Sequence, residues 1–153
     1  MIAIGSDHAG YELKTEIIKY LENKGCAVKD FGTYSADCSV DYPDYAVLVA
    51  KAVISGECEK GILICGTGIG ISIAANKIPG IRAALCTNTY MARMSIEHNN
   101  ANILALGSRV IGVGTALDIV DAWLEASFAG GKHEKRVEKI SILEKEYKTG
   151  VEF

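Results

Sequence analysis

The residues best suited to chemistry are Cys65 and the glycines that follow it, Gly66, Gly68 and Gly70, in the stretch GILICGTGIGISIAANK. A cysteine between an apolar run and a helix has its thiolate favoured by the positive end of the helix and by nearby amides. The glycines let the backbone turn tightly and present successive N–H groups to an anion. The stretch therefore predicts a proton-abstracting thiolate beside an oxyanion-binding loop, although a plain strand-to-helix turn has the same composition.

Two phosphate-binding motifs do not fit this loop. The dinucleotide fingerprint G-x-G-x-x-G requires glycine at position 71, where the sequence has Ile71, and an acidic residue after the next strand, which IRAALC does not supply. A P-loop requires Gly-Lys followed by Ser or Thr, and no such run follows. The loop is therefore predicted to bind an anion through its backbone and not to bind a nucleotide through either motif.

Polar residues also follow two other predicted strands. Asp7 and His8 come after the first strand, and Arg109 comes after the fifth. Ligands of a parallel sheet bind beyond the carboxyl ends of its strands, so these residues and Cys65 are expected at one edge. Asp7 has a second interpretation, as the N-cap of the helix that begins near Gly10.

A further set of polar residues lies outside this edge. His98 and Asn99 end a predicted helix, where a histidine can simply complement the helix dipole. A basic cluster follows near the carboxyl terminus: Lys132, His133, Lys135, Arg136 and Lys139. Such a cluster is either a solvated face or a phosphate-binding surface, and its spacing alone does not decide between them.

Short apolar runs alternate with segments of helical period, which is typical of a parallel sheet covered by helices. The predicted strands are 1–6, 26–32, 60–65, 81–86 and 102–107, and the predicted helices are 11–24, 43–56, 70–78, 88–98 and 115–128. No linker or repeat divides the chain. We therefore predict an α/β fold: a single doubly wound, Rossmann-like three-layer domain over residues 1–153, with about five strands.

Residues 130–153 follow the last predicted unit as a charged helix. An apolar stripe runs along it through Val137, Ile140, Leu143 and Tyr147. This tail helix either folds back on its own domain or lies across a second subunit.

Composition limits the classes of function. The 153 residues are 49% hydrophobic and 23% charged, with no apolar run long enough for a membrane span, so we expect a cytoplasmic protein without a membrane partner. The net charge of −3 argues against nucleic acid and favours small-molecule partners. The five cysteines show no C-x-x-C spacing and the three histidines form no ligand pair, so we predict neither a disulfide framework nor a metal site.

With these residues assembled, the sequence closely resembles the B-type ribose-5-phosphate isomerases, a family shared with the galactose-6-phosphate isomerase subunits. The matching segments are GSDHAG (5–10), DYPDYA (41–46), GILICGTGIGISIAANKIPGIRAA (61–84), HNNANILALGSRVIG (98–112) and GGKHEKRV (130–137). The resemblance implies interconversion of ribose 5-phosphate and ribulose 5-phosphate through a cis-enediolate, without a cofactor or a metal. It also implies a homodimer whose active sites are shared between subunits, and leaves open whether dimers pair into tetramers.

The resemblance assigns a role to each candidate residue. Cys65 is the catalytic base, His98 helps to open the sugar ring, and Thr67 relays or orients a proton. The enediolate would be held by the loop of Gly66, Thr67, Gly68, Ile69 and Gly70. The substrate would further contact Asp7, His8 and Asn99, with a basic site of Arg109, Lys132 and Arg136 and with Tyr42 as a weaker pocket candidate.

Two positions distinguish this chain within the family. Another branch replaces the cysteine by a glutamate just beyond the glycine loop, where this chain has Ile71, so Cys65 is the base here. Many members carry arginine where this chain has Lys132, so a bidentate phosphate contact becomes a point charge.

Two alternatives remain at this stage. The same chemistry would serve a hexose phosphate such as allose or galactose 6-phosphate, because pocket size decides the sugar. A flavodoxin-like binding or signalling module would share the fold. A receiver module, however, needs a phosphoacceptor aspartate at the end of the third strand, where Cys65 stands.

Overall fold

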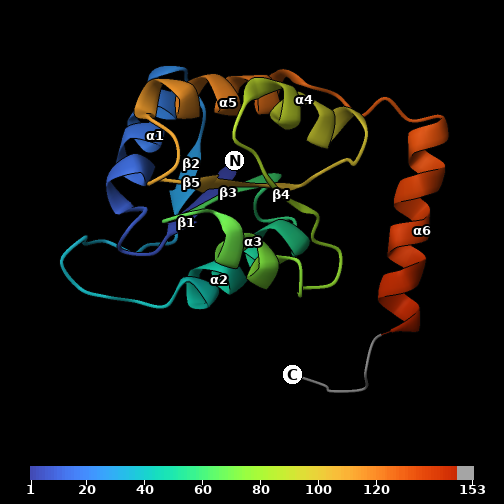
Figure 1. Ribbon diagram of the computed structural model, residues 1–153, viewed down its shortest axis with the longest axis horizontal. Coiled ribbons are helices and arrows are strands. Elements are labelled where there is room, and N and C mark those ends of the chain that lie inside the picture. The colour runs from blue at the N-terminus through green and yellow to red at the C-terminus, as the bar shows by residue number, and fades with distance from the viewer. Residues whose placement is uncertain (148–153) are drawn as a thin grey trace.

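The computed structural model describes residues 1–147 and shows a parallel sheet of five strands between two layers of helices, in the order β2-β1-β3-β5-β4 (Figure 1). The strands are Ile2–Ser6 (β1), Val28–Asp30 (β2), Lys60–Cys65 (β3), Ala83–Leu85 (β4) and Ile103–Gly107 (β5). The helices are Tyr11–Asn23 (α1), Tyr42–Ile54 (α2), Ile69–Ala75 (α3), Thr89–Glu97 (α4), Val113–Glu125 (α5) and Lys132–Glu146 (α6). The predicted three-layer α/β fold is confirmed.

The strand predicted over 26–32 is shorter than expected, because β2 spans only Val28–Asp30. Backbone hydrogen bonds to β1 continue beyond β2, from the N–H of Phe31 to the carbonyl of Ile4 and from the N–H of Thr33 to that of Ser6. Gly32 between them has φ +91°, outside the extended region, and its carbonyl accepts the N–H of Ser6 at 2.7 Å.

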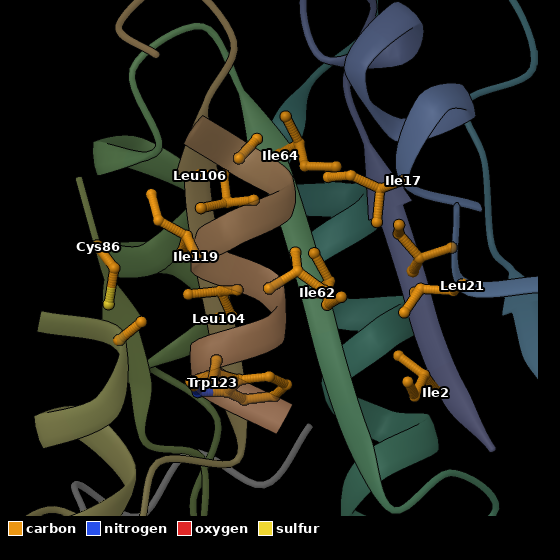
Figure 2. Packing of buried hydrophobic residues seen from close by; sticks show 14 of the residues in the cluster. Ile2, Ile17, Leu21, Ile62, Ile64, Cys86, Leu104, Leu106, Ile119 and Trp123 are labelled. Atoms are coloured by element: carbon orange, nitrogen blue, oxygen red, sulfur yellow. The ribbon is translucent and has the colours of Figure 1, made fainter. Parts of the chain in front are cut away.

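Side chains alternate between the two faces of the central strand β3. Ile62 and Ile64 point into the core that α1, α4 and α5 cover, against Ile17, Leu21, Ile119 and Trp123 (Figure 2). Leu63 and Cys65 belong to the second core, on the side of α2 and α3. The sheet therefore turns the Cys65 side chain towards the α2–α3 layer. Cys86 is buried in the first core and Cys26 packs against it, partly buried.

Helix α6 stands apart from the body of the domain, beside the edge strand β4 (Figure 1). None of its described residues is buried, and Ile140 and Leu143 line a groove of about 650 Å³ opposite Ala83 and Ala84. The carboxylate of Glu144 accepts a hydrogen bond of 3.0 Å from the Gly80 N–H. The predicted helix thus begins at Lys132 and touches its own domain at few points, and residues 148–153 of the predicted tail lie outside the described residues.

No helix within residues 1–147 combines the length and the apolar character needed to cross a membrane.

An ion pair between a buried lysine and a partly buried aspartate joins α1 to the end of β2. The Lys14 side chain is 1% exposed, and its Nζ lies 2.5 Å and 2.6 Å from the two carboxylate oxygens of Asp30. Asp30 also accepts the N–H of Gly32 at 2.9 Å, and the Lys14 ammonium lies 5.4 Å from the Tyr34 ring centroid. The pair therefore anchors the start of the loop that leads to α2.

We expect the Lys14→Met substitution to lower the free energy of unfolding by about 3 kcal/mol, because it leaves the Asp30 carboxylate without its cation in a partly buried position. The matched control is Lys19→Met on the same helix, where an exposed pair with Glu16 is worth about 0.5 kcal/mol or less. Urea unfolding of both variants at one protein concentration measures the difference. Equal, small losses would show that water, and not burial, governs the Lys14 pair.

Candidate active site

The carboxyl ends of β1, β3 and β5 lie side by side, and backbone hydrogen bonds hold the residues that follow them. Cys65 pairs in register with Gly107, and the N–H of Ser108 donates to the carbonyl of Cys65 at 2.9 Å. The N–H of Asp7 donates to the carbonyl of Ile64 at 3.2 Å. The structure therefore brings Asp7, Cys65 and Arg109 to one edge of the sheet on fixed backbone.

The sulfur of Cys65 accepts a hydrogen bond from the loop. The Gly68 N–H lies 3.1 Å from Sγ, and the Cys65 side chain is buried at the end of β3. The contact fixes the sulfur at the end of the strand and directs an amide donor at it. The contact supports the interpretation of Cys65 as a base.

The other fully buried cysteines differ from Cys65. The Cys86 sulfur lies 3.8 Å from the carbonyl oxygen of Ala84, to which its S–H donates. Burial raises the pKa of Cys86 to about 11, and burial also raises the pKa of Cys58. Both remain thiols near neutral pH and belong to the core.

Gly68 is the position where the loop requires glycine. Its φ is +77°, and a Cβ atom there would lie 2.5 Å from Leu85 Cδ1 and 2.9 Å from the carbonyl carbon of Leu106. Both the backbone conformation and the space exclude a side chain. The N–H that contacts the Cys65 sulfur is thus placed by a residue without a Cβ.

We expect Gly68→Ala to cost about 1–3 kcal/mol of stability and to lower turnover, because the loop must move away from Leu85 and the Cys65 sulfur. Gly114→Ala in α5 is the matched control, since a Cβ there meets nothing within 4 Å and should stabilise the helix by roughly 0.5 kcal/mol. Thermal unfolding and steady-state turnover of both variants test this. Wild-type values for Gly68→Ala would show that the loop geometry is dispensable.

Two side chains pack against the glycine loop. A Cβ at Gly66 would lie 3.4 Å from Arg109 Nη1, and a Cβ at Gly70 would lie 2.6 Å from Cζ of Tyr42. The guanidinium of Arg109 and the ring of Tyr42 therefore flank the loop. Thr67, which is exposed, accepts the N–H of Ile69 on its hydroxyl oxygen at 3.2 Å.

Asp7 and His8 are oriented by backbone donors. The carboxylate of Asp7 is buried and accepts the N–H of Gly10 at 3.0 Å. Gly10 itself is the N-cap of α1, so the interpretation of Asp7 as the N-cap residue was wrong. Nδ1 of His8 accepts the N–H of Val40 at 3.2 Å, which leaves Nε2 of the neutral ring as a donor.

His98 and Asn99 lie at the other end of the sheet. His98 is the C-cap of α4, and the carbonyl of Asn99 accepts from Nε of Arg82 at 3.1 Å, just before β4. The His98 ring stacks on the His133 ring of α6, with centroids 4.1 Å apart and planes within 9°. Burial lowers the pKa of His133, and the nearby His98 lowers it further. Lys132 and Arg136, which flank His133 on α6, add to this effect through their positive charges.

Within one chain the structure does not bring this second group to Cys65. The five residues of β5 separate the two ends of the sheet, and at roughly 3.3 Å per residue they rise about 13 Å. A cavity of about 640 Å³ between α1 and α5 reaches the first edge at Ser108 and Arg109, but Cys65 does not line it. The groove beside α6 is lined by Asn99 but not by Lys132 or Arg136.

The contacts of three residues at the two ends, Ser108, Val40 and His133, were not predicted from the sequence. The Ser108 hydroxyl lies 2.8 Å from the Ala9 carbonyl oxygen and 3.2 Å from that of Cys65, which ties β1, β3 and β5 together. The Val40 amide donates to the His8 ring, and the His133 ring stacks on the His98 ring. His133 stood out only as a member of a basic cluster, and no sequence pattern marks Val40.

Comparison with known proteins connects these residues to a family. The family model described as Ribose/Galactose Isomerase matches residues 2–140. Ribose-5-phosphate isomerase B of Escherichia coli (strain K12) is 54% identical over 143 residues, which cover 94% of this chain and 95% of that protein. D-erythrulose-4-phosphate isomerase of Pectobacterium atrosepticum is 47% identical over 147 residues, or 96% of this chain and 97% of that one.

Solved structures of the same family are also similar to this chain. Ribose-5-phosphate isomerase B of Clostridium thermocellum has a TM-score of 0.94 and 66% identity, covering 95% of this chain and 98% of that one. The Mycoplasma genitalium enzyme, solved with bound ribulose-5-phosphate, has a TM-score of 0.91 and 44% identity, covering 95% and 96%. The sequence match, the shared fold and the strand-end cysteine beside its glycine loop lead to one conclusion: this chain belongs to the ribose/galactose isomerase family.

Proposed function

We propose that the chain is a type B ribose-5-phosphate isomerase, which interconverts ribose 5-phosphate and ribulose 5-phosphate without a cofactor or a metal and works in the cytoplasm. The observation that carries the proposal is the Cys65 sulfur, which accepts an amide N–H at the end of the central strand. The family supplies the chemistry, and its members include proteins named for this substrate.

The reaction needs one base and a set of donors. The Cys65 thiolate takes the proton from C2 of the open-chain aldose, the C–H electrons form the C1–C2 double bond, and the carbonyl electrons move to O1. The amides and the Thr67 hydroxyl of the loop stabilise the resulting enediolate and move a proton between its oxygens. Return of the proton to C1 gives the ketose.

The remaining residues hold the sugar phosphate in place. Asp7, as a buried carboxylate, accepts sugar hydroxyls, and Nε2 of His8 donates towards the phosphate end. Arg109 beside Gly66 supplies a charge near the loop. Tyr42 packs on Gly70 and forms part of the pocket wall.

Each site is completed by a second copy of the chain. His98, Asn99, Lys132 and Arg136 lie at the opposite end of the sheet from Cys65, so an antiparallel dimer is the arrangement that joins them to one substrate. Large apolar side chains are exposed where such a partner would pack: Ile69, Ile73, Tyr90, Met91, Leu143 and Tyr147. In this arrangement residues 1–153 form one domain, and the tail segment, 130–153, to which α6 belongs, contacts the second subunit. His98 then protonates the ring oxygen of the furanose as the ring opens.

Turnover with matched sugars tests the substrate. We expect the kcat/KM for ribose 5-phosphate to exceed that for allose 6-phosphate and galactose 6-phosphate. NMR in deuterium oxide follows the isomerisation of each sugar. A hexose phosphate turned over faster would identify a hexose-6-phosphate isomerase. Exchange with none of these sugars would favour the flavodoxin-like binding module.

A further inference from the structure

The two stacked histidines come from different helices and are held together by the backbone. The N–H of Ala129 donates to the carbonyl of Glu97 at 3.0 Å, next to His98. Gly130 and Gly131 then turn the chain with φ of +64° and +57°, and α6 begins at Lys132. This anchored turn delivers the His133 ring onto the face of His98, with the centroids 4.1 Å apart.

Two imidazolium rings in face-to-face contact repel each other, so the stack disfavours two positive charges. His133 is the second residue of α6, where the amides of the first turn disfavour a cation on its ring.

The surrounding charges act in the same direction. Burial lowers the pKa of His133, and the positive charges of His98, Lys132 and Arg136 lower it further. The pKa of His133 is therefore lower than that of an ordinary histidine, so its ring stays neutral to a lower pH than usual. Other charged groups near the rings along the chain include Glu97 in the last turn of α4, Glu134 and Lys135 in the first turn of α6, and Arg82, which donates to the Asn99 and Asn100 carbonyls. Arg93 lies further back on α4, and Glu138 and Lys139 lie further along α6.

We propose that His133 is a positioning residue for His98: stacked face to face with it, the His133 ring fixes the orientation of the His98 ring. The inference rests on the proposed function, in which His98 donates a proton to the ring oxygen of the sugar. A neutral aromatic partner serves this purpose, since it holds the ring by its face and leaves the ring nitrogens of His98 free for the substrate.

The first experiment observes the pair without turnover. Proton NMR of the full chain follows the imidazole Cε1–H signals against pH, with His98→Asn identifying the His98 signal. We expect an upfield ring-current shift of the His98 signal that is retained in His133→Phe and lost in His133→Ala. We also expect the His133 signal to titrate below the ordinary histidine range. Identical His98 signals in wild type and His133→Ala would overturn the inference.

The second experiment separates ring opening from proton transfer at carbon. D-erythrose 4-phosphate forms no furanose ring, since its C4 oxygen carries the phosphate, and one relative is named for the corresponding ketose. We expect His133→Ala to lower kcat on ribose 5-phosphate by about tenfold, with a smaller loss on the tetrose and with recovery in His133→Phe. Lys139→Ala, an exposed change on the same helix, is the control.

The outcomes distinguish this inference from the proposed function. One outcome is that the wild type isomerises ribose 5-phosphate while the kcat of His133→Ala falls equally on both sugars or does not fall at all. In that case the positioning role is wrong and the proposed function stands. If neither sugar is turned over by any form of the protein, the function fails, and with it the purpose assigned to His133, whatever the NMR titration shows of the stack.

Discussion

Cys65→Ala should abolish exchange of the substrate C2 proton with solvent while the fold and the binding of ribose 5-phosphate persist. A positioned general base contributes on the order of 10²- to 10⁴-fold to the rate, and the loss in kcat should lie in that range. The side chain removed is a single sulfur at the end of β3, so the packing cost is small. NMR in deuterium oxide follows the exchange, and equilibrium binding of the sugar phosphate follows the affinity.

Cys86→Ala is the matched control for this variant. Cys86 is equally buried, but its S–H donates to a carbonyl and burial raises its pKa to about 11. Its removal should cost some stability, about 1 kcal/mol, and leave turnover in place. Proton exchange by Cys65→Ala at the wild-type rate would make Cys65 structural and require a different base.

Mixing two inactive variants should restore activity if each site draws on two chains. Removal of Arg136 takes away a charge-assisted contact to the phosphate, which costs about 1.5–3 kcal/mol. In a heterodimer of Cys65→Ala and Arg136→Ala, one site carries both lesions and the other carries neither. After subunit exchange of equal amounts, we expect roughly a quarter of the wild-type activity, since half of the dimers are heterodimers with one intact site.

The structure provides the matching negative control. Arg109 lies against Gly66 on the same edge as Cys65, so both residues enter a site from the same chain. A heterodimer of Cys65→Ala and Arg109→Ala would have one lesion in each site and should recover no activity. Recovery in both mixtures, or in neither despite heterodimer formation measured by mass spectrometry, would contradict the shared site.

The sequence by itself determined the elements and the edge where the chemistry lies. Apolar runs such as KGILIC and helical periods are local patterns, and they predicted the parallel sheet, the end of β3 at Cys65 and the turn at Gly68. The errors lie where pairing partners matter: the regular strand β2 covers only Val28–Asp30, although hydrogen bonds to β1 continue beyond it. The N-cap of α1 is Gly10 and not Asp7, whose N–H is bonded to Ile64 of the neighbouring strand.

Only the tertiary structure decided which distant residues meet. No sequence pattern marks Lys14 and Asp30, and His133 is in the sequence only a member of a basic cluster, but packing buries Lys14 beside Asp30 and stacks His133 on His98. It also placed His98 and Cys65 at opposite ends of the sheet, because α4 runs antiparallel to the strands and returns the chain to their amino ends. Periodicity and turn residues are properties of adjacent positions, whereas these contacts depend on how separate elements pack, and that information is spread over the whole chain.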